Sequence, residues 1–396
     1  MAMGIKEIKF IALSPTGSGI SGGDRIFIEL ARRWSNKYSL EIITTREGLL
    51  MMNSQNLSGK ELKINIISNN LPSGFFLKYI YKILLGLKYG LTEHFKYTKE
   101  TIIYPASDFW MDAFPAILLK IRFPKVKWVA TWYQTAPNPF IGYAEGNREE
   151  KYRFKAFLYW FSQLPIKPLI ANFADFVLVN NEIEKKQFPE LNKKNKAVVV
   201  LGAVDLSRIN SYILRHKSLI KKYDAVFQGR FHPQKGVVEL IDIWRKVVDK
   251  RPDASLVMIG DGPLMKDVKF KIQDLRLQKN VKLFGYVFDG DEKYKIFSQS
   301  KIVVHPAFYD SGGMAAAEAM AFGLPVIGFN LRSYKYYYPK GMVKVEIGDI
   351  DKFSMVVLDL LYNKKKRDEI AKEALEMLNQ NWSWDKRAAE IHKKII

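Results

Sequence analysis

The sequence of 396 residues contains no cysteine and only five histidines. Disulfide bonds, thiol nucleophiles and thiolate metal sites are therefore excluded. Acidic residues are also scarce, because 41 aspartates and glutamates stand against 62 lysines and arginines, which gives a formal net charge of +21. The positive excess is spread evenly, with +11 in residues 1–200 and +10 in residues 201–396. Such a charge favours binding to an anionic membrane, a nucleic acid or a phosphorylated substrate, and the charge alone does not indicate which of these the protein binds.

Long apolar runs are missing as well. No run reaches the roughly 18–20 residues of a membrane-spanning helix, and the apolar run after Lys9 is too short for a signal peptide. We therefore expect a cytoplasmic protein that lies at the cytoplasmic face of a membrane. The apolar (48%) and charged (26%) fractions are those of a globular protein. The length predicts two domains, because one core rarely grows this large.

Short apolar runs rich in β-branched residues alternate with helical patterns along the chain. A first series of strand-like runs covers residues 8–13, 40–45, 62–67, 101–106, 126–131, 176–181 and 197–201. A second series covers residues 224–230, 254–260, 280–286, 301–307 and 324–329. Strands that alternate with helices form parallel sheets with helices on both faces. The sequence therefore predicts an α/β protein of two doubly wound, Rossmann-like domains, with the seam near residues 201–210.

Ligands of such sheets bind beyond the carboxyl ends of the strands, where loops lead into helix N-termini. In the first such loop, residues 17–22 spell the G-x-G-x-x-G of dinucleotide-binding proteins. Three residues separate the preceding apolar run from the first glycine, however, and the run 40–45 ends without the acid that would bind a ribose. Two interpretations stay open: Gly22 and Gly23 let backbone amides approach a ligand, or the loop is a turn capped by Asp24.

Two cations mark the loop after the run 224–230. Arg230 and Lys235 stand five residues apart at the carboxyl end of a predicted strand. Cations in this arrangement can close on a diphosphate from two sides. A solvated loop with two ordinary cations is the alternative.

Two acids mark the loop after the run 301–307. Asp310 and Glu318 are eight residues apart. A Gly-Gly turn lies between them, and Glu318 itself stands within an alanine-rich helical pattern. The first amides of that helix, from about Gly313 and Met314, point at the space above the strand. A carboxylate in the first turns of the helix suits a ribose diol, and an acid with a structural role is the alternative.

Several segments resemble those of family-4 retaining glycosyltransferases. In chain order they read GRFHPQKGVVELI, LVMIGDGP, NVKLFGYVFD, HPAFYDSGGMAAAEAMAFGLPVI and WSWDKRAAEI, with GGDRIFIELARRW and ADFVLVNNEIEKKQF before them. The resemblance covers nearly the whole chain, strongly in residues 224–330 and loosely in 50–170. It implies a GT-B fold in which residues 1–205 bind the acceptor and residues 206–375 bind a nucleotide sugar across a cleft. Residues 376–396 would form a helix that packs back on the N-terminal domain.

The resemblance also implies roles for single residues. Arg230 and Lys235 would hold the donor diphosphate, Glu318 the ribose, and Asp310 the transferred sugar. Tyr133 would face the acceptor. The rest of the donor site would be Gly22, Gly23, Gly262, Tyr286, Gly312, Gly313 and Met314.

The implied reaction moves a hexose from a UDP- or GDP-linked donor, with retention, to a hydroxyl of a lipid-linked saccharide. It would need neither a cofactor nor a metal ion. Two residues depart from the family pattern, because Asp310 stands where the family usually has Glu, and Tyr133 where many members have His. A phenol can hydrogen-bond a sugar hydroxyl but cannot copy the proton chemistry of imidazole.

Other candidate ligands of a metal have simpler interpretations. Asp289-Gly290-Asp291 looks like the D-x-D motif of metal-dependent glycosyltransferases, but it lies between a predicted strand and a helical pattern, so we interpret it as a helix cap. Two acids alone rarely bind a divalent ion. We interpret His232 and His305 as loop and packing residues, because neither has an acid or histidine at ligand spacing.

Residues 73–99 and 151–170 are rich in aromatic and basic residues. In the first segment the apolar residues at helical spacing are Phe76, Tyr79, Ile80, Ile83, Leu84 and Leu87, and the lysines are Lys78, Lys82 and Lys88. This pattern suits a helix on an anionic membrane surface, and a core-facing helix with a lysine rim is the alternative.

Two other functions remain as alternatives: a catalytically weakened sugar-nucleotide binder and a basic nucleic-acid-binding module, although no motif of the latter is present.

Overall fold

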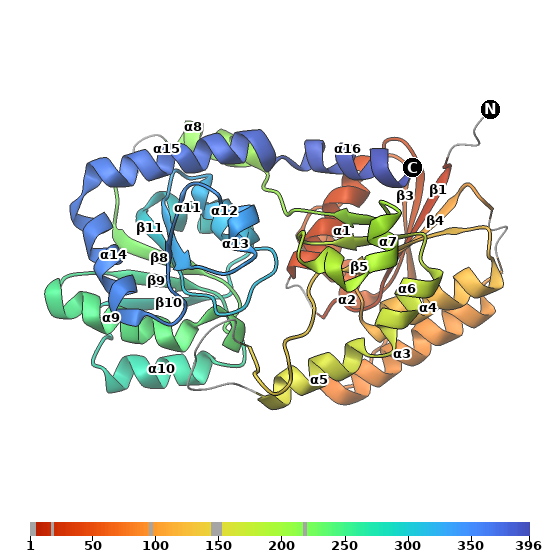
Figure 1. The fold of residues 1–396 in the computed structure, drawn as a ribbon, viewed down its shortest axis with the longest axis horizontal. Coiled ribbons are helices and arrows are strands. Elements are labelled where there is room, and N and C mark those ends of the chain that lie inside the picture. The colour runs from red at the N-terminus through yellow and green to blue at the C-terminus, as the bar shows by residue number, and fades with distance from the viewer. Residues whose placement is uncertain (1–4, 17–19, 95–97, 144–152, 217–219) are drawn as a thin grey trace. The chain divides into compact units, whose positions relative to one another are not determined.

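The computed structural model describes residues 5–16, 20–94, 98–143, 153–216 and 220–396. The chain divides into two compact units. The N-terminal unit comprises Met1–Ala136, Leu158–Gly202 and Trp384–Ile396, and the C-terminal unit comprises Pro137–Phe157 and Ala203–Ser383. Each unit is built around one parallel sheet with helices on both faces (Figure 1).

The sheet of the N-terminal unit has the strand order β3-β2-β1-β4-β5-β6-β7. Its strands are β1 (Glu7–Ala12), β2 (Ser39–Thr45), β3 (Leu62–Ser68), β4 (Thr101–Pro105), β5 (Lys127–Trp132), β6 (Phe176–Val179) and β7 (Ala197–Val199). All neighbouring strands pair in parallel. Successive residues of β1, such as Phe10 and Ile11, are both fully buried. A strand covered on both faces reads as a continuous apolar run, which is why these runs predicted the strands.

The helices of the N-terminal unit are α1 (Gly22–Trp34), α2 (Arg46–Ser54), α3 (Phe75–Thr92), α4 (Trp110–Arg122), α5 (Arg153–Gln163), α6 (Ile166–Phe173), η1 (Glu184–Gln187), α7 (Pro189–Lys193) and α16 (Trp384–Ile395), and α5 begins within the C-terminal unit. The helices α3 and α4 lie side by side (Figure 1). They approach closely because α3 carries Gly86 and Gly90, where a Cβ would lie 2.6 Å from the Met111 carbonyl oxygen and 2.9 Å from the Pro115 Cα, respectively. The last helix, α16, packs on α1, where the Trp34 indole donates to the Ala388 carbonyl at 3.3 Å.

The sheet of the C-terminal unit has the strand order β10-β9-β8-β11-β12-β13. Its strands are β8 (Tyr223–Gln228), β9 (Leu256–Ile259), β10 (Val281–Gly285), β11 (Ser300–His305), β12 (Val326–Phe329) and β13 (Met342–Val345). This is the strand order of the dinucleotide-binding fold, and it reverses direction between β8 and β11. The predicted class of two doubly wound α/β domains is confirmed. Every predicted run contains a strand, whereas β13 was not predicted.

The helices of the C-terminal unit are α8 (Leu206–Arg215), η2 (Pro233–Lys235), α9 (Val237–Lys250), α10 (Met265–Asp274), α11 (Asp291–Ser298), α12 (Met314–Met320), α13 (Tyr334–Tyr337), α14 (Ile350–Tyr362) and α15 (Lys364–Asn381). The core of this unit is mainly aliphatic, with several aromatic side chains from the sheet and from α9 and α14. Trp244, Phe329 and Phe353 are fully buried there. Among the helices that the structure describes, none is both long and apolar enough to cross a membrane.

Candidate functional site

The reversal of strand order places the candidate residues of the C-terminal unit at one edge of its sheet. Arg230 follows β8, Gly262 follows β9, Tyr286 follows β10 and Asp310 follows β11. These four strands are neighbours in the sheet, and all run in the same direction. The loops after β8 and β11 diverge at the reversal point, which is where doubly wound sheets bind their ligands.

A partly buried ion pair joins the loops after β8 and β11. The Lys235 Nζ lies 2.8 Å from Asp310 Oδ2, which also accepts from the Tyr334 hydroxyl at 3.0 Å. The Asp310 side chain is only 9% exposed. Burial by itself would raise the pKa of Asp310, but the charge of Lys235 and the hydrogen bond from His305 hold the pKa well below its ordinary value. The Asp310 carboxyl is therefore ionised at neutral pH, and two residues predicted from the sequence are in direct contact.

His305 has an acid partner that the sequence interpretation missed. It ends β11, its ring is stacked on Phe227 with the centroids 6.1 Å apart, and its Nε2 lies 3.3 Å from Asp310 Oδ2. Burial lowers the pKa of His305, so the imidazole is neutral at pH 7. The interpretation of His305 as a packing residue agrees with its burial, and the hydrogen bond with Asp310 adds a partner that the sequence interpretation did not name. His232 is a loop residue as interpreted, and its Nδ1 accepts from the Gln234 amide at 3.4 Å.

The turn between β11 and α12 is closed by the same carboxylate. Asp310 Oδ1 accepts from the backbone amides of Gly312 and Gly313, both at 3.2 Å. Gly313 has φ +54°, and a Cβ there would lie 2.9 Å from the Tyr338 ring. The amides that we expected to meet a ligand thus donate to Asp310. Their role toward a ligand, like that of Met314 at the start of α12, stays a prediction.

Arg230 presents a charge to solvent. Its side chain is exposed, and within the described part of the chain its guanidinium has neither a hydrogen-bond nor an ion-pair partner. Burial raises the pKa of Tyr143 to about 12, and the charge of Arg230 opposes that rise. The Tyr143 ring meets the edges of His232 and Tyr309, with centroids 5.0 and 6.2 Å apart. Tyr143 was not predicted, because it follows β5 in a stretch without any motif.

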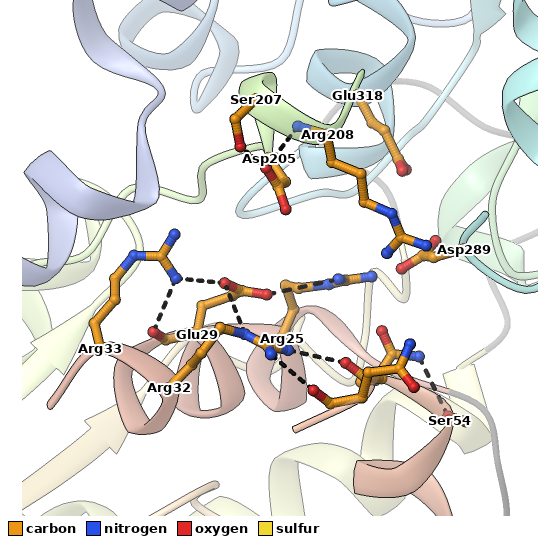
Figure 2. Close-up of polar contacts among 12 residues, drawn as sticks. Arg25, Glu29, Arg32, Arg33, Ser54, Asp205, Ser207, Arg208, Asp289 and Glu318 are labelled. Carbon is orange, nitrogen blue, oxygen red and sulfur yellow. Dashed lines mark hydrogen bonds and ion pairs between the residues drawn. The ribbon is translucent and has the colours of Figure 1, made fainter. Parts of the chain in front are cut away.

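Glu318 has an unexpected cationic partner. Its Oε2 lies 2.7 Å from the Nζ of Lys293 on α11, and the same Lys293 also pairs with Asp289. The interpretation of Asp289-Gly290-Asp291 as a helix cap is wrong, because the N-cap residue of α11 is Gly290, which makes no side-chain cap bond. Figure 2 shows the Asp289 carboxylate beside the guanidinium of Arg208. No group of three acids or histidines in the described ranges gathers closely enough to hold a metal ion.

Gly262 and Tyr286, the two other residues predicted in this unit, differ in how closely they are packed. Gly262 has φ +157°, and a Cβ there would lie 2.5 Å from the Phe231 carbonyl oxygen. Only glycine therefore lets the loop after β9 pack against the loop after β8. Tyr286 is 43% exposed and rests edge-on against Phe288. Both lie at the predicted edge, and their contact with a donor stays a prediction.

In the N-terminal unit the glycine-rich loop ends in a helix cap. Gly22 is the first residue of α1, and Ser21 is its N-cap: the Ser21 hydroxyl accepts from the Asp24 amide, and the Asp24 carboxylate accepts from the Ser21 amide. The cap is thus a reciprocal capping box rather than a turn capped by Asp24 alone. Residues 17–19 of the G-x-G-x-x-G pattern lie outside the described residues.

Tyr133 and Gly23 lie against each other. A Cβ on Gly23 would be 3.2 Å from Tyr133 Cδ2, so the glycine makes room for the ring. Tyr133 is 8% exposed, and its hydroxyl lies 2.5 Å from the Tyr104 hydroxyl. Burial raises the pKa of Tyr133 well above its ordinary value. The phenol is therefore neutral, and two predicted residues meet at the start of α1.

The helix α1 also carries a group of charges that the sequence interpretation missed. The buried Glu29 pairs with Arg33 at 2.6 Å, and with Arg32 and Arg25 at 3.8 and 3.9 Å (Figure 2). One carboxylate thus serves three guanidinium groups on one helix. The signal was the spacing of three to four residues along α1, which places these side chains on one face.

The aromatic-basic helix α3 has two apolar faces rather than one. Phe76, Ile80 and Leu84 are 72%, 39% and 57% exposed. Ile83 is buried, and Tyr79 and Leu87 pack on the core of the unit. Of the lysines on this helix, Lys78 and Lys82 both bind Glu47, at 2.6 and 2.8 Å. Lys82 is buried, so it does not belong to the exposed lysine rim of the alternative interpretation.

Comparison with known proteins identifies the C-terminal unit. Residues 212–377 match the family model of glycosyl transferases group 1. This segment is a group 1 glycosyltransferase domain. The predicted resemblance is thus confirmed, and the match lies within the unit that holds Arg230, Lys235, Asp310 and Glu318.

Solved structures share the fold of the whole chain. The Anabaena protein HepE, solved with UDP and glucose, has a TM-score of 0.73 at 15% identity, with 98% of each chain covered. Sucrose-phosphate synthase from Thermosynechococcus elongatus has a TM-score of 0.70 at 16% identity, also with 98% of each chain covered. At these identities the likeness shows the GT-B fold.

Curated relatives match parts of the chain. An uncharacterized glycosyltransferase of Methanocaldococcus jannaschii is 26% identical over 65% of this chain and 60% of its own length. The poly(glycerol-phosphate) alpha-glucosyltransferase of Bacillus subtilis is 24% identical over 41% of this chain and 26% of its own. The UDP-Gal:alpha-D-GlcNAc-diphosphoundecaprenol alpha-1,3-galactosyltransferase of Escherichia coli is 31% identical over 40% of this chain and 43% of its own. The chain therefore spans between a quarter and three fifths of the length of these relatives.

Proposed function

We propose that this protein transfers a hexose from a UDP- or GDP-linked donor to a hydroxyl of a lipid-linked saccharide, with retention at the anomeric carbon. The exposed Arg230 guanidinium at the reversal point of the sheet carries the proposal, because an anionic ligand is the natural partner of a cation placed there. The Escherichia coli relative is named for a UDP-sugar and a diphosphoundecaprenol saccharide, and a HepE structure holds UDP-glucose. Both names support this donor and acceptor chemistry.

In the proposed reaction the bond between the anomeric carbon and the β-phosphate oxygen breaks. A bond to the acceptor oxygen forms on the same face of the sugar, and the hydroxyl proton passes to the departing phosphate. The products are the extended saccharide and a nucleoside diphosphate. Negative charge builds on the β-phosphate, and Arg230 and Lys235 would stabilise it. The cations would do this without a metal ion or a cofactor, so we expect EDTA to leave the rate unchanged.

The acids would position the donor. Glu318 would accept the ribose hydroxyls. Asp310, which Lys235, His305 and Tyr334 hold in place, would face the transferred sugar. In the N-terminal unit Tyr133 would present its hydroxyl to the acceptor, in the place where the resemblance implies histidine.

The test begins with thermal-shift screening against UDP, GDP, ADP and their sugar conjugates. Transfer is then measured for Arg230→Ala and Lys235→Ala, each of which should lose orders of magnitude in turnover. Arg245→Ala and Lys246→Ala are matched controls, since both cations lie on α9 and pair with acids, Asp249 on α9 and Asp351 on α14. Near-normal transfer by both Arg230→Ala and Lys235→Ala would contradict the mechanism. Binding of the donor without any release of nucleoside diphosphate would instead support a catalytically weakened binder.

We also propose that α3 docks on an anionic membrane, as a lipid-linked acceptor requires. The exposed apolar face of α3 consists of Phe75, Phe76, Leu77, Ile80, Leu84 and Leu91. Such a row of large apolar side chains on one helix is typical of an interfacial helix. The formal net charge of +21 complements an anionic surface.

Flotation with vesicles that contain phosphatidylglycerol tests the membrane proposal. At low salt the protein should float with the vesicles, and Phe76→Ser/Leu84→Ser should remain at the bottom. Phe270→Ser is the control, since Phe270 is 71% exposed on α10 of the other unit and should not alter flotation. A wild-type protein that stays at the bottom would mean a soluble acceptor, and retention on DNA stronger than on vesicles would favour the nucleic-acid alternative.

A further inference from the structure

A buried lysine lies beside Glu318. The side chain of Lys293 is 1% exposed, and its ammonium is shared between Glu318, at 2.7 Å, and Asp289. Lysine is almost never fully buried unless it is paired. The ammonium is held by two carboxylates and in turn binds Glu318 Oε2. The ion pair therefore fixes the orientation of the Glu318 side chain.

The side-chain amide of Gln228 contacts the same carboxylate oxygen. Gln228 ends β8, and its Nε2 lies 3.4 Å from Glu318 Oε2. Its Oε1 is buried and accepts no hydrogen bond from the residues that the structure describes. A buried acceptor without a donor is unfavourable, so a ligand hydroxyl that donates to it would be recognised.

We propose that Gln228 and Lys293 make this site specific for a ribose with both hydroxyls. The proposal rests on the proposed function, which places the donor's ribose at Glu318. One hydroxyl donates to the Glu318 carboxylate, and the neighbouring hydroxyl donates to Gln228 Oε1. Gln228 is a binding residue, whereas Lys293 is a positioning residue that acts through Glu318. The ligand class is a ribonucleoside diphosphate, and a deoxyribonucleoside diphosphate leaves one acceptor unfilled.

A purely structural role makes a different prediction. As a tie between α11 and α12, Lys293 would support stability alone, and its loss would weaken binding of all nucleotides equally. The ratio of affinities for the ribo and deoxy forms separates the two roles. That ratio changes only if Gln228 binds a sugar hydroxyl, or if Lys293 orients Glu318 toward one.

The experiment is calorimetric titration of the full chain with UDP and GDP, and with the 2′-deoxy and 3′-deoxy forms of whichever binds. The wild-type protein should bind the ribo form at least about tenfold more tightly than one of the deoxy forms. In Gln228→Met and Lys293→Met the ribo form should lose about tenfold in affinity while that deoxy form changes little, so the ratio falls toward one. Lys293→Arg keeps the positive charge and should restore most of the ratio.

Two outcomes overturn the proposal. The first is a wild-type protein that binds the ribo and deoxy forms equally, and the second is an unchanged ratio in Gln228→Met and Lys293→Met. If Lys293→Met does not fold, Asp289→Asn/Lys293→Met removes both charges of one pair and carries the same expectation. A wild-type protein that binds no nucleoside diphosphate overturns the proposed function itself, which is a separate result.

Discussion

The carboxyl of Asp112 provides a quantitative test of the loop that leads into α1. Asp112 is fully buried, and its Oδ1 accepts from the amides of Leu13 and Ser14 at 2.6 and 3.1 Å, while Oδ2 accepts from the Ser107 hydroxyl at 2.6 Å. Burial raises its pKa to about 6 in spite of these hydrogen bonds. The charged form is thus stabilised by its donors but penalised more by the loss of water.

The sign and size of the effect follow from that pKa. In the unfolded chain the carboxyl loses its proton near its ordinary pKa of 3.8, whereas in the folded protein it keeps the proton up to about pH 6. Stability is therefore lost as pH rises between these two values. One pKa unit corresponds to about 1.4 kcal/mol, so the total loss is about 3 kcal/mol.

Asp112→Asn copies the protonated acid. The amide oxygen can accept from Leu13 and Ser14, and the amide nitrogen can donate to Ser107. We expect the variant to match the wild-type protein near about pH 4 and to be more stable by about 3 kcal/mol near about pH 8.

Urea denaturation at several pH values measures the difference. Glu61→Gln is the control, because Glu61 is exposed in the same unit, and its free energy of unfolding should stay within about 0.5 kcal/mol of the wild-type value throughout. An Asp112→Asn protein that is less stable than the wild-type protein near pH 8 would refute the reasoning. So would a difference that does not vary with pH.

Three further substitutions test the contacts around the two candidate regions. Gly236→Ala should cost more than about 2 kcal/mol in urea denaturation, because φ is +61° and the new Cβ would lie 2.0 Å from the Pro306 carbonyl oxygen; a neutral result would show that this loop readily rearranges. Asp310→Asn should cost about 3–5 kcal/mol at neutral pH. Because the pKa of Asp310 is depressed, that cost should be constant from pH 8 to about 5 and shrink only below about pH 4, a profile that melting curves can check. Tyr133→Phe removes the bond to Tyr104 and should lose about 1 kcal/mol; no loss would mean that the two hydroxyls do not stabilise the fold.

The strands could be predicted because parallel strands are buried on both faces. The run at residues 40–45 is an example, since Leu40, Ile42 and Ile43 are all within 1% of full burial. The strand β13 escaped prediction because it is an edge strand of four residues in which Val343 and Lys344 are half-buried, so the apolar signal is short and interrupted.

Positions after strands could be predicted for the site, but partners across helices could not. Topology alone brings Lys235 and Asp310 to one edge, because both follow strands beside the reversal point. Lys293 and Glu318 lie on two different helices and are 25 residues apart in sequence, so no local pattern encodes their pairing. His305 was missed for another reason: its acid partner was sought at metal-ligand spacing, whereas a hydrogen-bonded pair needs no such spacing.

The contact between α1 and α16 joins residues that are 354 positions apart in the sequence. Trp34 lies in the first tenth of the chain, but the backbone oxygen that its indole nitrogen reaches belongs to Ala388. On the ribosome the part of α1 that contacts α16 stays uncovered until α16 has emerged, long after the strands of the sheet have been made. The C-terminal unit has its complete sheet before that moment, so it can mature first although it is translated second.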